Sequence, residues 1–128
     1  MMRRTFAGTT VVISGAGGGL GRALALRFAR AGARVVGLDR DEASIQALHE
    51  ELSRSGGEAL CLPCDVTDAA ACRAAIATAC ERFGRIDVVI NNAGLSHRSA
   101  FADTDVAVLR RVMDVNLFGA IHLTHPAL

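Results

Sequence analysis

Short apolar runs rich in β-branched residues alternate along this chain with longer stretches in which apolar positions recur every three or four residues. The short runs are typical of strands buried on both faces of a parallel sheet, and the longer stretches of helices that cover such a sheet. The predicted strands are residues 9–14, 34–38, 58–62 and 86–90. The alternation predicts an α/β fold, with a doubly wound parallel sheet of about four strands and helices on both faces.

Capping signals bound the predicted helices. The expected helices are residues 20–31, ended by Gly32; a second from a cap at Asp39 or Asp41 to about Arg54; a third from Thr67 or Asp68 to Phe83, ended by Gly84; and a fourth from Thr104 onward, after a polar loop over residues 96–102. The strand at 86–90 is apolar on both faces and expects a neighbour on each side, and no strand follows the last helix. We therefore expect one domain over residues 1–128 that resembles the first half of a larger fold.

Composition narrows the class of protein. The chain is 51% hydrophobic, and its 14 basic and 13 acidic residues are interspersed, giving a net charge of +1. This balance argues against a nucleic-acid or anionic-membrane partner. No apolar run reaches the roughly 20 residues that span a bilayer, and the N-terminus lacks the order of a signal peptide. We interpret the protein as cytoplasmic, and its four cysteines fit that compartment.

Neither the cysteines nor the histidines predict a metal site. Cys61 and Cys64 have C-x-x-C spacing, but Cys61 lies in a predicted strand, where residues three apart point to opposite faces. His122 and His125 lie three apart on a predicted helix without a third ligand nearby in the sequence. The expected role of the cysteines is that of small buried apolar residues.

The first strand runs directly into a glycine-rich turn, from Ser14 and Gly15 to Gly21. Glycines between a strand and a helix let the backbone approach a pyrophosphate, and the helix end offers N–H donors and a positive field. Asp39 closes the next strand, about 20 residues on, where an acidic side chain can bind the hydroxyls of the adenosine ribose. The sequence thus predicts a Rossmann-type fold that binds a dinucleotide.

Asn91-Asn92-Ala93-Gly94 directly follows the fourth predicted strand. This places it at the carboxyl end of the sheet, where open α/β sheets bind ligands, and its side chains can fix strand ends or line the cleft. An ordinary Asn-Gly turn is the alternative reading of these residues taken alone.

Together these motifs resemble the short-chain dehydrogenase/reductase family, and the resemblance covers essentially the whole chain. The matching segments are Ser14-Gly15-x-x-x-Gly19-x-Gly21, Cys64-Asp65-Val66-Thr67, Asn91-Asn92-Ala93-Gly94 and Val115-Asn116-Leu117-Phe118-Gly119. The resemblance implies hydride transfer between a nicotinamide cofactor and an alcohol or carbonyl substrate. It also implies that the helix within residues 101–128 pairs with its twin in a homo-oligomer.

The resemblance also implies a role for each matching residue. The glycine turn would hold the pyrophosphate through Ser14, Gly15, Gly19, Leu20 and Gly21. Asp39 would bind the ribose and favour NAD over NADP, although the adjacent Arg40 can pair with a 2′-phosphate. The adenine would be held by Asp65 and Val66, and the remaining cofactor contacts would come from Asn91, Ala93 and Gly94. Asn116 would bend its helix and join the proton relay as the one catalytic residue present.

The departure from the family concerns catalysis. Its members use a Tyr and a Lys in a Y-x-x-x-K arrangement that follows the Asn by a few dozen residues, whereas this sequence contains no Tyr and no Lys. We therefore expect the chain to hold the cofactor-binding half, to stop before the Tyr-x-x-x-Lys segment, and to be inactive alone. The alternatives are a catalytically inactive nucleotide-binding or interaction module, and a partial chain without an independent fold.

Overall fold

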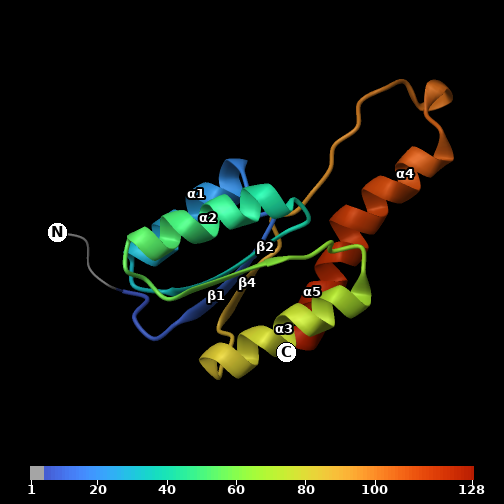
Figure 1. Cartoon of the computed structure of the whole chain (residues 1–128). Coiled ribbons are helices and arrows are strands. Elements are labelled where there is room, and N and C mark those ends of the chain that lie inside the picture. The colour runs from blue at the N-terminus through green and yellow to red at the C-terminus, as the bar shows by residue number, and fades with distance from the viewer. Residues whose placement is uncertain (1–4) are drawn as a thin grey trace.

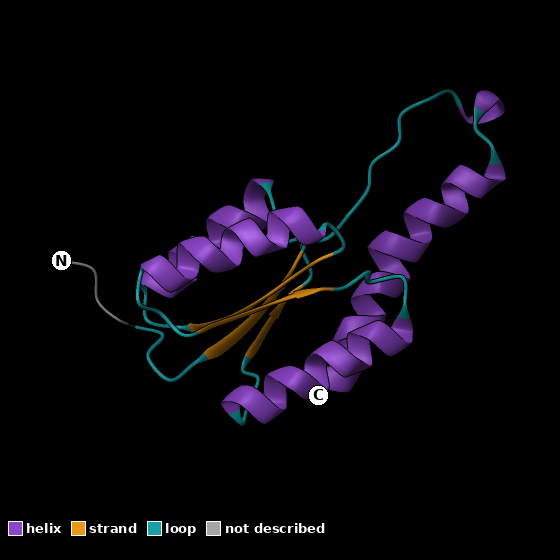
Figure 2. Cartoon of the chain, viewed as in Figure 1, coloured by secondary structure: helices purple, strands orange, loops and turns teal. Residues whose placement is uncertain are grey.

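The computed structural model describes residues 5–128 and contains one parallel four-stranded sheet in the order β3-β2-β1-β4. The strands are β1 (Thr10–Ser14), β2 (Arg34–Asp39), β3 (Ala59–Pro63) and β4 (Val88–Ile90). In the pairing register Val12 lies opposite Val36 and Val89, and Val36 lies opposite Leu60. The predicted doubly wound α/β fold is confirmed (Figures 1 and 2).

Helices cover both faces of this sheet. The first face carries α1 (Gly19–Arg30) and α2 (Glu42–Arg54), and the second carries α3 (Ala69–Phe83) and α5 (Gly119–Ala127) (Figure 1). Each face of the sheet has its own hydrophobic core, and alternate residues of β1 point into one or the other. Val11 and Ile13 pack with the first pair of helices, and Val12 packs with the second. The near-continuous apolar sequence of the strands reflects burial on both faces.

The predicted helix caps explain two helix starts and one helix end. Asp41, rather than Asp39, caps α2 by accepting a hydrogen bond from the backbone N–H of Ser44, and Asp68 caps α3 through Ala71 in the same way. Gly84 ends α3 in the left-handed conformation, with φ of 78°, which a glycine adopts without steric cost.

Strand β4 is two residues shorter than predicted, beginning at Val88 rather than at Ile86. The backbone N–H of Thr10 donates to the Asp87 carboxylate at 2.8 Å, while the N–H of Asp87 donates to the carbonyl of Thr10 at 3.0 Å. Because the Asp87 side chain, rather than its backbone, makes one of these two bonds, regular backbone pairing of β4 with β1 starts at the next residue, Val88.

The single helix expected from Thr104 onward is divided in the structure. A short 3₁₀ turn, η1 (Phe101–Asp103), precedes it, and Asp105 caps α4 (Val106–Met113). A π-helical turn, η2 (Asp114–Phe118), then joins α4 to α5. The helix α4 stands away from the sheet, at the end of the loop that leaves β4 (Figure 1).

Candidate functional site

The carboxyl ends of β1 and β4 are fastened together by Ser14 and Asn92. The buried Ser14 hydroxyl accepts hydrogen bonds from the backbone N–H groups of Asn92, at 3.1 Å, and Ala93, at 3.0 Å. In return, the Asn92 side-chain amide donates to the carbonyl oxygens of Ser14 and Gly15, both at 3.1 Å. These four bonds bring the glycine turn and the Asn-Asn-Ala-Gly turn to one edge of the sheet, as the sequence predicts.

The glycine turn leaves no room for side chains at its two ends. A Cβ atom on Gly15, where φ is +64°, would lie 3.0 Å from Cα of Ala93. A Cβ atom on Gly21 would lie 2.1 Å from the carbonyl oxygen of Gly15. These contacts explain why the sequence has glycine at both positions, since α1 starts directly against the turn that precedes it.

The N-terminus of α1 differs from those of α2, α3 and α4. The side chains of Asp41, Asp68 and Asp105 cap α2, α3 and α4. Gly18, the N-cap residue of α1, makes no side-chain cap bond, and the first turn of α1 contains no acidic residue. The positive end of this helix dipole is therefore not neutralised by a carboxylate of its own first turn.

The Asp39 carboxylate is fixed at the end of β2 by two backbone groups. One oxygen accepts from the N–H of Gly17 at 2.9 Å, and the other accepts from the N–H of Asp41 at 2.9 Å. A Cβ atom on Gly17 would lie 2.7 Å from Cβ of Ser44. Gly17 is thus a site residue that the sequence reasoning missed, although it stands in the same glycine run.

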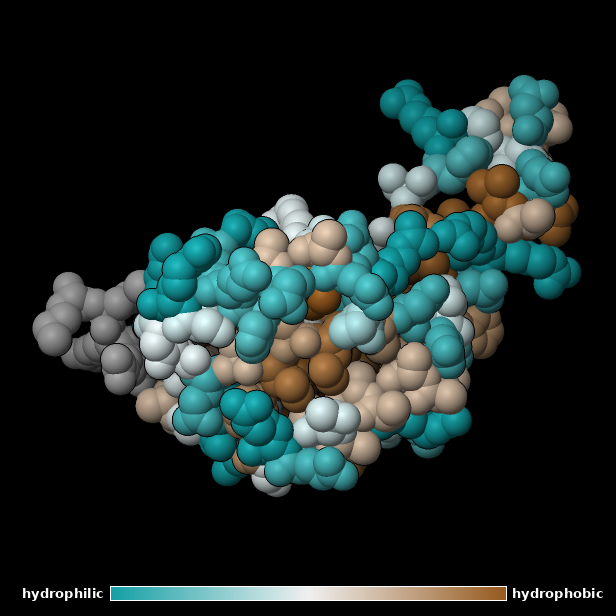
Figure 3. All heavy atoms as spheres, in the orientation of Figure 1, coloured by the Kyte–Doolittle hydropathy of each residue, from teal (hydrophilic) through white to brown (hydrophobic). Residues whose placement is uncertain are grey.

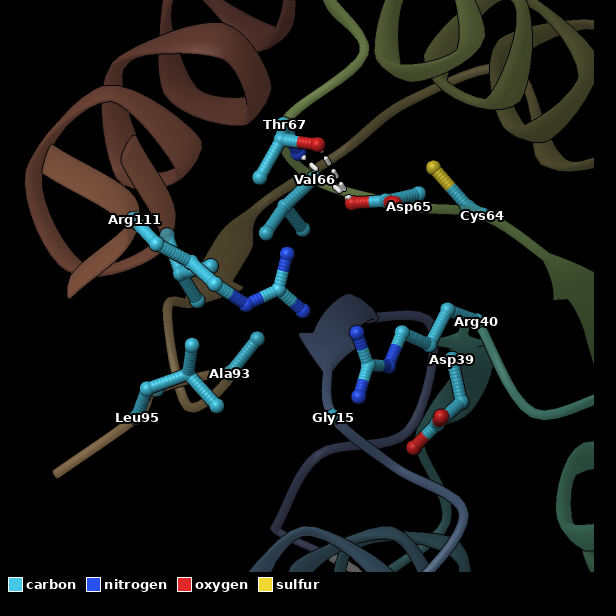
Figure 4. Close-up of a pocket in the computed structure, with 12 residues that line it drawn as sticks. Gly15, Asp39, Arg40, Cys64, Asp65, Val66, Thr67, Ala93, Leu95 and Arg111 are labelled. Carbon is cyan, nitrogen blue, oxygen red and sulfur yellow. Dashed lines mark hydrogen bonds between the residues drawn. The ribbon is translucent and has the colours of Figure 1, made fainter. Parts of the chain in front are cut away.

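A pocket opens between these strand ends. The predicted site residues that line it are Gly15, Asp39, Arg40, Asp65, Val66, Ala93 and Gly94. Its wall also includes residues that were not predicted, namely Cys64, Thr67, Leu95, Arg111 and Val115. The guanidinium groups of Arg40 and Arg111 extend into the pocket from opposite sides (Figure 4). Arg111 lies on α4, more than 70 residues after Arg40, and no motif in the sequence links the two.

Asp65 is held in place by Thr67. The backbone N–H of Thr67 donates to the Asp65 carboxylate at 2.9 Å, and its hydroxyl donates at 2.8 Å (Figure 4). These two bonds hold the pKa of Asp65 below its usual value, with smaller contributions from the positive charges of Arg40 and Arg111. The carboxylate is therefore ionised at neutral pH and can accept hydrogen bonds from a ligand.

The π-helical turn presents Asn116 to the loop after β4. Its side-chain oxygen accepts from the backbone N–H of Leu95, and its side-chain NH₂ donates to the carbonyl of Leu95, each at 2.7 Å. The irregular turn includes Asn116, and the bend expected there stays a prediction. The two bonds tie α4 and α5 to the loop that forms one wall of the pocket.

The other predicted site residues lie beside the pocket rather than in its lining. Ser14 is buried behind the glycine turn, whereas Leu20 is 68% exposed at the start of α1. The Asn91 side-chain amide donates to the hydroxyl of Thr124 on α5 at 2.9 Å. Asn92, which was not among the predicted cofactor contacts, makes the bonds that hold the two turns together.

The cysteines and histidines singled out in the sequence do not gather into a metal-binding group. Within residues 5–128, no cluster of three or more His, Cys, Asp or Glu side chains could hold an ion. His122 instead contacts the carbonyl oxygen of Val66, and the Cys64 sulfur lies 4.0 Å from that of Cys72. No helix in this part of the chain has the length and apolar character needed to cross a membrane.

Comparisons with known proteins agree on one family. A family model described as short chain dehydrogenase matches residues 9–128. The chain is 44% identical to a bovine protein named dehydrogenase/reductase SDR family member 7B, covering 96% of this chain and 40% of that one. It is 40% identical to a probable oxidoreductase, EphD, of Mycobacterium tuberculosis, covering 94% of this chain and 20% of that one.

Solved structures give the same result. The crystal structure of a short chain dehydrogenase from Mycobacterium smegmatis superposes with a TM-score of 0.94 at 32% identity, covering 98% of this chain and 53% of that one. A putative short-chain dehydrogenase/reductase from Burkholderia xenovorans gives a TM-score of 0.90 at 35% identity, with 98% and 49% covered. The chain thus spans about half the length of these structures, and 40% or less of the two curated relatives above.

Proposed function

The chain belongs to the short-chain dehydrogenase family, and we propose that it supplies the NAD-binding half of an oxidoreductase acting on an alcohol or carbonyl substrate. The observation that carries this proposal is the position of Asp39. Its carboxylate is fixed by the N–H groups of Gly17 and Asp41 and lines the same pocket as Gly15 and Asp65. A glycine turn, an acidic strand end and a second acidic loop around one pocket match the donor and acceptor pattern of an adenosine diphosphate.

The glycine turn fits a pyrophosphate. Cβ atoms built on Gly18 and Gly19 would meet nothing within 4 Å, so the space in front of α1 is open. Gly19 has φ of +54°, which disfavours any side chain there. With no acidic residue in the first turn of α1, the helix N-terminus is suited to an anion. Gly15, Gly19, Leu20 and Gly21 would form this cradle, with Ser14 fixing it from behind.

The pocket lining supports NAD over NADP. Asp39 would accept hydrogen bonds from the ribose hydroxyls, and its negative charge would repel a 2′-phosphate. Arg40 opposes this preference because its guanidinium can pair with a phosphate. The adenine would lie against Asp65 and Val66, and the nicotinamide half would pass along the Asn91–Gly94 turn. When bound, the nicotinamide supplies the hydride acceptor or donor.

We assign Asn116 as the single member of the catalytic set in this chain. Its support is the π-helical turn and the paired bonds to Leu95, which hold it at the wall of the pocket. General acid/base catalysis contributes about 10²- to 10⁴-fold to such reactions. Because the 128 residues include no Tyr and no Lys, hydride transfer needs residues that this chain does not contain.

We also propose that the protein forms a homo-oligomer in the cytoplasm through α4, η2 and α5. Apolar side chains form an exposed stripe along these elements, from Val106 (60% exposed) through Leu109, Met113 and Leu117 to Ile121 (48%). Hydrophobic surface is visible over the protruding α4 end in Figure 3. A stripe of this kind is suited to pairing with a second copy about a twofold axis. In analytical ultracentrifugation we expect the Met113→Glu variant to have a lower mass than the unsubstituted protein. Equal masses would contradict this assignment.

The test of cofactor binding is a titration with NADH and NADPH, followed by nicotinamide fluorescence. We expect NADH to bind at least about tenfold more tightly, a difference of about 1.4 kcal/mol. Asp39→Asn removes the charge but keeps one acceptor oxygen. It should bring the dissociation constants of NADH and NADPH closer together. Asp41→Asn, two residues away at the α2 cap, is the matched control and should leave the ratio unchanged.

Each outcome of this titration separates the hypotheses. Tighter binding of NADPH would overturn the choice of NAD, and absence of binding to either would overturn the cofactor assignment. Binding of NADH by a complete gene product that catalyses no alcohol or carbonyl turnover would favour the alternative function, an inactive nucleotide-binding module.

A further inference from the structure

Helix α5 contacts the adenine side of the pocket from behind through His122. The ring nitrogen Nδ1 of His122 lies 2.8 Å from the carbonyl oxygen of Val66. A carbonyl oxygen can only accept a hydrogen bond, so Nδ1 carries the proton in this contact. The side chain of Val66 lines the pocket, which means that His122 holds the backbone of a pocket residue without reaching the pocket itself.

The approach of α5 to this loop is close. A Cβ atom on Gly119 would lie 2.7 Å from Cγ2 of Val66, so only a glycine lets the helix backbone lie there. Gly119 and His122 are three residues apart and share one face of α5. Helix α5 therefore contacts both the side chain and the backbone of Val66. Gly119 packs against the side chain, and His122 binds the carbonyl oxygen.

The same carbonyl is approached from a second helix. The Cys72 sulfur of α3 lies 3.7 Å from the Val66 oxygen and 3.9 Å from the Asp65 oxygen. A thiol is a weak donor, whereas the imidazole N–H is a full-strength one. His122 thus makes the stronger of the two contacts that fix the loop bearing Asp65 and Val66.

We propose that His122 is a positioning residue for the adenine side of the cofactor pocket. It acts by holding the Val66 carbonyl, and so the Asp65–Thr67 turn, at a fixed height above the sheet. This inference rests on the proposed function, because it takes the pocket to hold the adenosine half of a dinucleotide. A purely packing role is the competing explanation, since the His122 ring also lies 6.5 Å from the Phe118 ring, centroid to centroid.

Two substitutions separate the explanations. His122→Asn keeps an N–H donor near the position of Nδ1, whereas His122→Leu keeps apolar volume and removes the donor. Leucine is also the better helix former, so helix propensity alone favours His122→Leu. His125→Asn and His125→Leu, made at the exposed histidine one turn on, are the matched controls.

The readout is the dissociation constant of the protein produced from its complete gene, measured by calorimetry with ADP-ribose and with nicotinamide mononucleotide. One neutral hydrogen bond is worth about 1 kcal/mol, and this is the most that its loss can transmit to the pocket, so we expect His122→Leu to weaken ADP-ribose binding by up to about fivefold. We expect His122→Asn to restore most of that affinity and the mononucleotide to be unaffected in both variants. Equal weakening by the two substitutions, or no weakening by His122→Leu, would overturn the proposal.

Hydrogen exchange gives a second readout that does not require nucleotide. The backbone N–H groups of Thr67 and Asp68 both donate to Asp65, so their exchange reports the shape of this turn. We expect faster exchange at these two amides in His122→Leu and not in His122→Asn, with β2 amides unchanged as the internal reference. Failure of the unsubstituted protein to bind ADP-ribose would count against the proposed function, while unchanged exchange in His122→Leu would count against His122.

Discussion

Gly21 lies against Gly15 so closely that a Cβ atom on Gly21 would be 2.1 Å from the Gly15 carbonyl oxygen. No rotation of a side chain relieves this contact, because both groups belong to the backbone or are attached directly to it. We expect Gly21→Ala to lower the free energy of unfolding by about 1–3 kcal/mol, the usual cost of overpacking. Urea unfolding of the unsubstituted and variant proteins measures the change.

Gly18→Ala is the control for this substitution. Gly18 has an extended backbone, with φ of −160°, and a Cβ atom there would meet nothing within 4 Å. The unfolding midpoint of Gly18→Ala should therefore stay close to that of the unsubstituted protein. A similar loss of stability in both variants would mean that the turn does not impose the tight contact at Gly21.

Substitution of Asn92 should also lower the free energy of unfolding. Asn92→Leu removes two donors to the Ser14 and Gly15 carbonyls and leaves those oxygens without these partners. We expect a loss of about 1–3 kcal/mol in the free energy of unfolding. The neighbouring Asn91→Leu removes one exposed bond to Thr124 and should cost about 1 kcal/mol or less. A larger loss of stability in Asn91→Leu than in Asn92→Leu would contradict the claim that Asn92 holds the ends of β1 and β4 together.

Asp87 should make stability depend on pH in the acid range. The Thr10 N–H, followed by Arg85, holds the pKa of Asp87 below its usual value of 3.8. A lowered pKa in the folded state stabilises the protein above the unfolded-state pKa, and this contribution is lost as the pH falls through the folded-state pKa. Asp87→Asn cannot titrate, so its unfolding midpoint should fall less than that of the unsubstituted protein between pH 5 and about pH 3. Parallel curves for the two proteins would contradict this assignment.

The four thiols should react at two very different rates. Burial raises the pKa of Cys61 to about 11 and that of Cys64 to about 12, and it raises the pKa of Cys72 as well. Cys80 is exposed on α3. Because the thiolate is the reactive form, an aromatic disulfide reagent at pH 8 should modify one thiol per chain rapidly. Cys80→Ser should abolish that fast phase, and a fast phase that survives the substitution would show that a core cysteine is accessible.

Prediction from sequence succeeded where the physical cause is local. Capping by Asp68, termination of α3 at Gly84 and the pairing of apolar strands depend on residues that are neighbours in sequence or on simple periodicity. The family resemblance singled out Asp39 and Asp65, and the structure brings both to one pocket, while their contacts with a cofactor stay predictions.

Contacts between distant segments were not predictable in this way. The late start of regular pairing at β4 depends on a bond between Thr10 and Asp87, 77 residues apart. Arg111 lines the pocket from α4, which lies beyond the long loop after β4, and no spacing rule connects it with Arg40. Gly17 was visible as a glycine, but its bond to Asp39 requires the register of β1 against β2.

The fastening of the pocket loops has a consequence for the order of folding. Ser14 is bonded to a residue 78 positions later, Val66 to one 56 positions later, and Leu95 to one 21 positions later. Contacts of such wide separation form slowly because large loops must close first. A chain still leaving the ribosome therefore has its first strands long before it has a pocket. On the proposed function, affinity for a nucleotide would arise at the end of folding, so the nucleotide would stabilise the finished fold rather than its precursors.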